Sequence, residues 1–350
     1  MNASSQIAVV LLNLGGPDDL ASVEPFLVNL FSDREIIELP GGAALQPMLA
    51  RLLAKVRGPA VRRNYALIGG GSPQLAITRA QAEALETRLN EAASGGRYRV
   101  YVAMRYSRPS AADVFASITA AGITRVVTLT LFPHYSKATT GSSQREFDRV
   151  LASPQWRELK SGLEISHIHH YSADSRYLDA MGDTVNAAWH AIAEDRRPGT
   201  VILFSAHSLP QRFIEAGDPY LSHINATRFG ILARLGLRNR QVLAYQSRTG
   251  PVRWLGPGTD ETLVELGRSG VRDVLIVPLS FVSDHIETLY EVDVLFADIA
   301  RKAGITGYHR TAALNTHPRF VDALAGLVRD SVGDMAQPEV HRPSAAAAGL

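Results

Sequence analysis

Residues 270–293 of this 350-residue chain read GVRDVLIVPLSFVSDHIETLYEVD, and this stretch predicts a β-strand that turns directly into a helix. The apolar, β-branched run at residues 274–279 is typical of a strand buried on both faces of a parallel sheet. Within four residues the pattern becomes helical, which places Asp284, Glu287 and Glu291 at i, i+3 and i+7 on one face. A buried strand followed by a helix is the repeating unit of α/β folds.

The three carboxylates of this row repel one another, and His285 lies beside them. Such a row is stable when it is exposed to water, when its members share protons, or when it faces a cation. A solvated acidic surface is the simpler interpretation. However, the row follows the carboxyl end of a buried strand, which is where open α/β sheets bind their ligands. Both interpretations stay open on this stretch alone.

The same pattern occurs a second time in the chain. Residues 122–140 (GITRVVTLTLFPHYSKATT) align with residues 270–288, and residues 9–17 (VVLLNLGGP) align with residues 201–210 after a one-residue adjustment. Internal similarity of this kind indicates two similar α/β halves. Each half is expected to be a Rossmann-like domain, a parallel β-sheet flanked by helices, with a cleft between the two. We expect an N-terminal domain at residues 1–172, a C-terminal domain at residues 173–332 and a disordered tail at residues 333–350.

Apolar periodicity and turn residues predict the individual elements. The expected strands are residues 7–14, 98–106, 125–132, 163–170, 201–204, 242–245 and 274–279, and the main expected helices are residues 20–31, 74–93, 111–121, 144–151 and 179–195. Two glycine clusters, LGGP at residues 14–17 and GGGSP at residues 69–73, lack the spacing of dinucleotide-binding and P-loop motifs. We therefore interpret them as tight turns and expect no nucleotide cofactor.

Composition excludes several classes of protein. A net charge of +2, without a cluster of basic and aromatic residues, gives no indication of nucleic-acid binding. Because the chain has no cysteine, it cannot form a disulfide, a thiolate zinc site or a Cys-ligated [2Fe–2S] cluster. The N-terminus lacks a basic segment and a long apolar run, so we expect a cytoplasmic protein without a signal peptide or membrane span.

A helix expected at about residues 43–57 is both amphipathic and basic. Its apolar side chains recur at helical spacing, with Arg51, Lys55 and Arg57 between them; they are Leu45, Met48, Leu49, Leu52, Leu53 and Val56. Such a helix can simply pack on the core, form the lip of a hydrophobic cleft, or rest on an anionic membrane. Packing is the default interpretation, and peripheral association with the inner membrane face through residues 45–56 is the alternative.

His207 follows the apolar run of residues 201–204 in the sequence FSAHSLP, at the end of an expected strand. An isolated histidine at such a position is more often a hydrogen-bonded structural residue. Imidazole also titrates near neutral pH, and its neutral form binds borderline metals such as Fe(II). If it is paired across a cleft with the acidic row, His207 forms a histidine–carboxylate site that can move protons or hold a divalent cation.

Several motifs together resemble the ferrochelatase family. In chain order they are LLNLGGP (11–17), GGGSP (69–73), AMRYSRP (103–109), TTGSS (139–143), FSAHSLP (204–210), GPVRWLGPGTDE (250–261) and SFVSDHIETLYEVD (280–293). The resemblance extends from about residue 7 to about residue 332, and FSAHSLP combined with SDHIETLYE is highly specific. It implies two chelatase-type domains around a porphyrin cleft. It also implies insertion of Fe(II), as a substrate, into protoporphyrin IX with release of two protons to form protohaem, the terminal step of haem biosynthesis.

The resemblance further implies roles for individual residues. His207 and Glu287 match the active-site histidine of the family and the carboxylate that faces it, so both are expected to act in catalysis and in iron binding. Asp284, His285 and Glu291 are expected to form a relay for protons or iron. The residues expected to contact or hold the porphyrin are Leu14, Tyr65, Ser72, Arg105, Tyr106 and Trp254.

The chain departs from some relatives at two places. Ala66 and Leu67 stand where some members carry basic residues, which puts porphyrin propionate binding at that point in doubt, and Leu295 ends the acidic row one turn earlier than in others. Two other functions fit the same residues. One is a cobalt or nickel chelatase acting on another tetrapyrrole, because a histidine–carboxylate pair does not select Fe(II). The other is a non-catalytic porphyrin or haem carrier.

Overall fold

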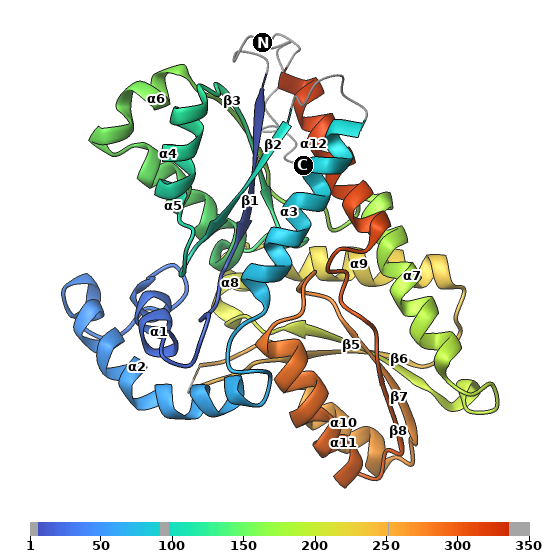
Figure 1. Ribbon diagram of the computed structural model, residues 1–350. Coiled ribbons are helices and arrows are strands. Elements are labelled where there is room, and N and C mark those ends of the chain that lie inside the picture. The colour runs from blue at the N-terminus through green and yellow to red at the C-terminus, as the bar shows by residue number, and fades with distance from the viewer. Residues whose placement is uncertain (1–5, 92–97, 251, 336–350) are drawn as a thin grey trace, which may run out of the picture.

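The computed structural model describes residues 6–91, 98–250 and 252–335, and two parallel four-stranded sheets organise this part of the chain (Figure 1). The first sheet has the order β2-β1-β3-β4, with β1 (Ile7–Asn13), β2 (Tyr98–Met104), β3 (Arg125–Thr130) and β4 (Glu164–Ile168). The second has the order β6-β5-β7-β8, with β5 (Val201–His207), β6 (Gln241–Gln246), β7 (Asp273–Pro278) and β8 (Gly307–Arg310). All pairs of neighbouring strands are parallel, and the two orders are equivalent. The prediction of two similar Rossmann-like halves is therefore confirmed.

Strand β1 shows why these sheets need helices on both faces. All seven of its residues are buried. Ile7, Val9 and Leu11 belong to one hydrophobic cluster, whereas alternate residues belong to another, formed with the buried faces of α4 (Ala111–Ala121) and α5 (Ser142–Leu151). A one-residue slip of β1 would exchange the side chains of the two clusters, so burial on both faces fixes the register of the strand.

Helix α4 begins and ends where local signals predict, whereas the helix expected at residues 179–195 lies at Ser175–Ala191, with Asp174 as its N-cap. For α4, the Ser110 hydroxyl accepts the Asp113 N–H, the Asp113 carboxylate accepts the Ser110 N–H, and Gly122 ends the helix at φ 64°. The remaining α-helices are α1 (Val23–Ser32), α2 (Gly42–Ala66), α3 (Gln74–Glu91), α6 (Arg157–Gly162), α7 (Ser175–Ala191), α8 (Gln211–Glu215), α9 (Tyr220–Leu235), α10 (Thr259–Arg268), α11 (Ala297–Lys302) and α12 (Pro318–Met335).

Helix α2 is longer than the expected 43–57 and forms an α-helical hairpin with α1 at one side of the molecule (Figure 1). Gly58 and Pro59 predict a helix end, yet the helix continues to Ala66. Its buried residues, including Ala54 and Tyr65, pack in the same cluster as Val23 of α1. This tertiary packing outweighs the local preference of glycine and proline.

Helix α12 joins the two halves. It packs on α7 and on α3 and β4, which belong to opposite halves of the chain (Figure 1). The helix continues through Met335, past the expected start of the tail at residue 333, and residues 336–350 lie outside the described part. The division of the chain into domains at residue 172 stays a prediction. Within the described residues, no helix combines the length and apolar character that a membrane crossing requires.

The two aligned segments of the internal repeat fold alike. After β3 the chain forms a short π-helix, η2 (Lys137–Gly141), and after β7 it forms a longer one, η5 (Glu287–Phe296). The expected α-helix that places Asp284, Glu287 and Glu291 on one face is therefore wrong. Asp284 precedes the helix, and the i→i+5 hydrogen bonds of a π-helix change which residues share a face. Wide turns of this kind occur frequently at functional sites.

Candidate active site

A cavity of about 340 Å³ lies between the two halves, and both halves line it. Most of its wall is apolar, including Phe26, Phe31 and Ile37 from the N-terminal half. The predicted site residues in its lining are Leu14, Tyr65, Ser72, Trp254, His207, His285 and Glu287. A mainly apolar cavity with a few converging polar groups is the usual form of a small-molecule site.

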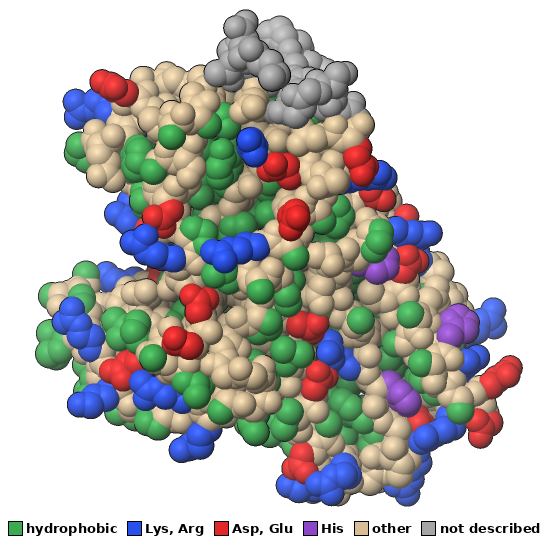
Figure 2. Space-filling view, viewed as in Figure 1, with side chains coloured by type: hydrophobic (Ala, Val, Ile, Leu, Met, Phe, Trp, Pro, Cys, Tyr) green, Lys and Arg blue, Asp and Glu red, His purple; other side chains and the backbone are tan. Residues whose placement is uncertain are grey.

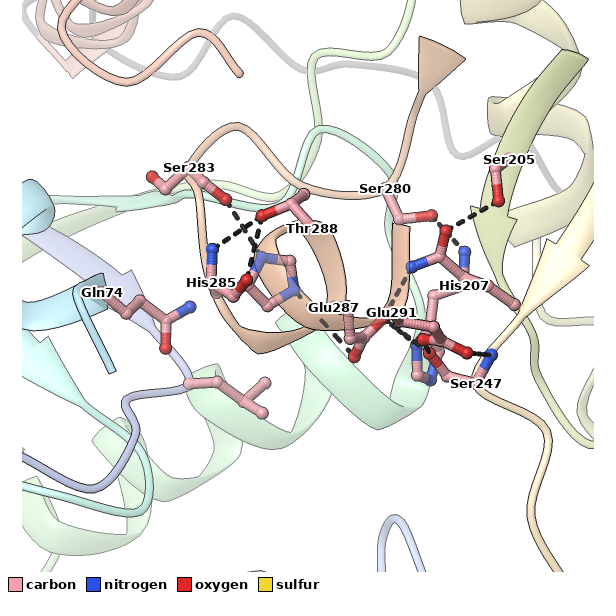
Figure 3. Close-up of polar contacts among 12 residues, drawn as sticks. Gln74, Ser205, His207, Ser247, Ser280, Ser283, His285, Glu287, Thr288 and Glu291 are labelled. Atoms are coloured by element: carbon pink, nitrogen blue, oxygen red, sulfur yellow. Dashed lines mark hydrogen bonds and ion pairs between the residues drawn. The ribbon is translucent and has the colours of Figure 1, made fainter. Parts of the chain in front are cut away.

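His207 and Glu287 form the central pair of the polar wall (Figure 3). The Nδ1 atom of His207, at the end of β5, lies 2.8 Å from Oε2 of Glu287, the first residue of η5. Two further contacts hold the backbone of His207: its N–H donates to Ser280 (2.7 Å) and its carbonyl accepts from the Tyr220 hydroxyl (2.9 Å). His207 thus ends β5, Glu287 follows the neighbouring strand β7 of the same sheet, and the two contact each other directly, so the expected pairing across a cleft is wrong.

The two partners favour the ion-paired state. Burial by itself would lower the pKa of His207, but the Glu287 carboxylate and its hydrogen bond raise it above the usual value. Burial would raise the pKa of Glu287, yet His207, with help from His285 and Ser247, lowers it. A carboxylate only accepts hydrogen bonds, so Nδ1 of His207 carries the proton that is shared with Glu287.

Ser247 connects Glu287 to Glu291 (Figure 3). Its hydroxyl lies 2.9 Å from Glu287 and also contacts the second oxygen of Glu291, while its backbone N–H donates to the first (2.8 Å). Burial, followed by the charge of Glu287, raises the pKa of Glu291 to about 7. One hydroxyl proton cannot serve two carboxylates, so when Glu291 is protonated it can donate to Ser247 while Ser247 donates to ionised Glu287. The result is a hydrogen-bonded path between two carboxyl groups.

His285 provides a neutral imidazole on the other side of Glu287 (Figure 3). Its Nδ1 lies 3.1 Å from the Ser283 carbonyl, which can only accept, so Nδ1 carries the proton. Burial lowers the pKa of His285 although Glu287 is near, so the ring is neutral at pH 7. Its Nε2 has no hydrogen-bond partner among the described residues and lies 4.0 Å from Glu287. The unprotonated Nε2 of His285 and the Glu287 carboxylate are therefore two neighbouring electron-pair donors.

Four predicted residues do not line the cavity. Asp284 points to other partners, Arg310 (3.3 Å) and Asn315 (2.9 Å), and so takes no part in the row with Glu287. Arg105 and Tyr106 lie outside the cavity lining, where both donate to the Asp33 carboxylate. They belong to the wall behind the cavity. Glu291 lies behind Glu287 and reaches the cavity through Ser247.

The glycine clusters act as close-packed turns at the cavity edge. A Cβ on Gly16 would come within 2.6 Å of Ser72, and a Cβ on Gly71 would come within 2.2 Å of the Asp18 carbonyl oxygen. The Ser72 N–H donates to the Pro17 carbonyl (2.7 Å), which joins the two loops. Glycine is needed because only a residue without Cβ permits this approach.

Sequence reasoning missed several residues of the site. Ser247 has φ 64°, a strained conformation for a residue other than glycine, and such strain clusters at functional sites. Phe281 packs against both His285 (ring centroids 4.1 Å apart) and His207 (5.9 Å). Arg57 of α2 also lines the cavity. Of these residues, only Ser247 had a signal in the sequence, because it directly follows an expected strand, where other polar residues of the site also lie.

Comparison with known proteins agrees with this geometry. A sequence model of the family named ferrochelatase matches residues 6–332. The chain is 48% identical over 325 residues to a ferrochelatase of Geotalea uraniireducens, which covers 93% of this chain and 98% of the relative. It is also 46% identical over 331 residues to a ferrochelatase of Synechocystis sp., covering 94% of this chain and 83% of that relative.

Solved structures with the same architecture are more distant in sequence. SirB from Bacillus subtilis with Fe3+ gives a TM-score of 0.52 at 12% identity, covering 94% of this chain and 96% of SirB. The sirohydrochlorin chelatase SirB in complex with cobalt gives a TM-score of 0.51, also at 12% identity, with the same coverage. This likeness shows the two-domain chelatase fold alone. The extent and identity of the sequence matches show more: the chain belongs to the ferrochelatase family.

Proposed function

We propose that this protein is a ferrochelatase that inserts Fe(II) into protoporphyrin IX. The observation that supports this most is the His207–Glu287 pair in the wall of an apolar cavity, with Glu291 behind it. Fe(II) replaces two pyrrole N–H protons, so one metal ion enters and two protons leave. The site therefore needs a proton acceptor, a route for protons and donors for a divalent cation.

The apolar part of the cavity is suited to the macrocycle. Leu14, Tyr65 and Trp254 are proposed to contact the ring, and Ser72 together with Arg57 is proposed to hold a propionate. Arg57 provides the positive charge that Ala66 and Leu67 do not. Holding the ring in a bent form, which exposes its nitrogens, costs about 1–5 kcal/mol that binding energy must supply.

Proton transfer is proposed to begin at Glu287. This carboxylate is ionised at neutral pH and lies at the cavity wall, so it can accept a pyrrole proton. The proton then passes through the Ser247 hydroxyl to Glu291, provided that Glu291 is ionised at that moment. Because the pKa of Glu291 is about 7, this group can release the first proton near neutral pH and then accept the second pyrrole proton by the same route.

Iron binding is proposed to use the same wall. Once the His207 imidazolium has given up a proton, its imidazole and the Glu287 carboxylate supply a nitrogen and an oxygen donor. The Nε2 atom of His285, which has no hydrogen-bond partner among the described residues, lies on the opposite side of Glu287. Neutral imidazole and carboxylate together suit Fe(II) and other divalent metals. Asp284 acts only indirectly, because Arg310 and Asn315 hold it.

An anaerobic assay with Fe(II) and protoporphyrin IX tests the function. Haem absorbance should develop with wild-type protein and should be lost in His207→Ala and Glu287→Gln, while porphyrin binding, measured by fluorescence, persists. Porphyrin binding without turnover would indicate a carrier. No activity on protoporphyrin, but cobalt or nickel insertion into another tetrapyrrole, would indicate a different chelatase.

We further propose that α2 rests on a membrane surface. Met48, Leu52 and Val56 are spaced four residues apart and are 58%, 60% and 69% exposed, with Arg51 and Lys55 between them. Hydrophobic and basic side chains mix on this side of the molecule (Figure 2). An amphipathic helix of this kind binds anionic lipid by burying its apolar side chains and by the attraction of its basic side chains to the lipid headgroups.

Vesicle co-sedimentation tests the membrane proposal. Binding to vesicles with anionic lipid should decrease when Leu52→Asp and Val56→Asp are combined. The same double change to alanine, which keeps the helix and adds no charge, should have a smaller effect. Absence of binding by the wild-type protein, or equal binding by the aspartate variant, would contradict the proposal.

A further inference from the structure

The buried carboxylate of Asp33 collects an unusual number of donors. Asp33 is 7% exposed, and one of its oxygens accepts from Arg105 (2.8 Å), Tyr106 (2.5 Å) and Ser142 (2.6 Å). The other oxygen accepts the N–H of Glu35 (2.9 Å). Burial would raise the pKa of this carboxyl, but the Ser142 and Tyr106 hydroxyls and the Arg105 guanidinium lower it. Asp33 is therefore a fixed negative charge inside the N-terminal half.

Asp33 lies at the end of α1, at the start of a segment that forms part of the cavity wall. Its own carbonyl accepts the N–H groups of Ile36 (3.2 Å) and Ile37 (3.0 Å). The side chains of Ile36 and Ile37, with Phe31 before them, line the cavity. The position of this apolar wall therefore depends on the position of Asp33.

A second buried polar residue holds the other side of the same segment. Gln46 of α2 is 2% exposed, and its amide nitrogen donates to the carbonyls of Phe31 (2.7 Å) and Ile37 (2.8 Å). Its amide oxygen accepts the Leu39 N–H (3.0 Å). The segment is thus held between α2 on one side and the Arg105–Tyr106–Ser142 group on the other.

From this arrangement we infer that Asp33 is a positioning residue for the ligand of the cavity. Its carboxylate fixes residues 33–37 so that Ile36 and Ile37 present an apolar face to a flat ligand. Arg105 and Tyr106 act on the ligand through Asp33, without contacting it. The identity of that ligand as a porphyrin rests on the proposed function.

The substitution Asp33→Asn removes the charge and keeps the size of the side chain. Asparagine keeps one acceptor oxygen and has an NH₂ group in place of the other, so either the three donors or the Glu35 N–H face a donor instead of an acceptor. In both orientations Arg105 loses its buried counter-ion and the segment loosens. The dissociation constant for protoporphyrin, measured by fluorescence, and the KM for it should both rise by about fivefold or more, with kcat within about twofold of wild type. Glu35→Gln is the matched control. It lies in the same segment, but its ion pairs with Arg145 and Lys137 are largely exposed, and it should change both constants less than twofold.

Two further variants keep the inference testable if Asp33→Asn does not fold. Tyr106→Phe and Ser142→Ala each remove one donor and leave the charge, so each should give a smaller rise in the dissociation constant. Adding Arg105→Gln to Asp33→Asn should recover part of the lost affinity, because the buried cation then no longer lacks a partner.

The outcomes separate this inference from the proposed function. If Asp33→Asn, Tyr106→Phe and Ser142→Ala lower the melting temperature but leave the dissociation constant and KM unchanged, Asp33 is only structural and the inference is wrong. If the wild-type protein binds protoporphyrin without inserting iron, the proposed function fails, and the shift in the dissociation constant still decides the role of Asp33.

Discussion

Replacement of Glu291 by glutamine should remove the pH dependence of iron insertion near neutrality. In the wild-type protein, burial and the neighbouring Glu287 raise the pKa of Glu291 to about 7. The proposed proton route requires Glu291 in its ionised form, so kcat should rise as the pH increases through 7. With a pKa of about 7, the ionised fraction is about one tenth at pH 6 and about nine tenths at pH 8, which predicts a roughly tenfold rise in kcat.

Glutamine at position 291 preserves the hydrogen bonds and removes the ability to take up a proton. Its amide oxygen can accept the Ser247 N–H, as the Glu291 oxygen does at 2.8 Å, and its NH₂ group can donate to the Ser247 hydroxyl. The variant therefore imitates the protonated acid. We expect its kcat to be low and constant from pH 6 to pH 8, about 10²-fold below wild type at pH 8.

Initial rates of haem formation at saturating Fe(II) and porphyrin, measured anaerobically between pH 6 and pH 8, provide the test. Glu265→Gln on the exposed surface of α10 is the control and should keep the wild-type profile. A Glu291→Gln variant that retains the tenfold rise would refute the assignment of the pH dependence to Glu291. A variant with unchanged kcat would refute the proton route itself.

Three other predictions follow from individual contacts. Ser247→Ala keeps the backbone N–H bond to Glu291 but breaks the hydroxyl bridge. We expect kcat to fall about tenfold while the porphyrin dissociation constant stays within about twofold of wild type. A tenfold weakening of porphyrin binding would contradict this role of Ser247. Gln81→Ala leaves Ser283 and the Asn315 carbonyl without their buried partner, and urea unfolding should show a loss of about 1–3 kcal/mol. Burial lowers the pKa of His134 from 6.5 to about 3, so the unfolded chain binds more protons between these values and stability should fall as the pH falls from 6.5. His134→Gln should flatten that slope in urea titrations, and an unchanged slope would assign it to other groups.

The sequence predicted seven strands because parallel strands buried on both faces have a strong apolar signal, but it missed β8, whose short sequence GYHR has no such signal. Strand β1 and helix α4 lie within one residue of their expected bounds, as alternation and capping residues are local features. The length of α2 was not predictable in this way, since its second half is helical only through contacts with α1. The same holds for η5: the spacing of its carboxylates predicted an α-helix, whereas the segment forms a π-helix.

Part of the candidate site could also be identified from the sequence. His207 and Glu287 are 80 positions apart, yet His207 ends β5 and Glu287 follows β7, and these neighbouring strands bring the two side chains to within 2.8 Å. Arg105 could not be placed correctly, because nothing near it in the sequence indicates that Asp33 is its partner. Asp284 was assigned to the acidic row on spacing alone, whereas contacts with Arg310 and Asn315 hold it elsewhere.

The sequence by itself determined the two parallel α/β halves, the family and the identity of the His207–Glu287 pair. These three features can be recognised from the order of strands, the apolar periodicity and the residue types within short segments of the chain. Only the tertiary structure decided that burial and Glu287 raise the pKa of Glu291 to about 7, that Ser247 links the two carboxyl groups, and that donors from distant segments meet on Asp33. The physical reason is that a pKa or a buried hydrogen bond depends on desolvation and on charges a few ångströms away, and folding brings those groups from distant parts of the chain.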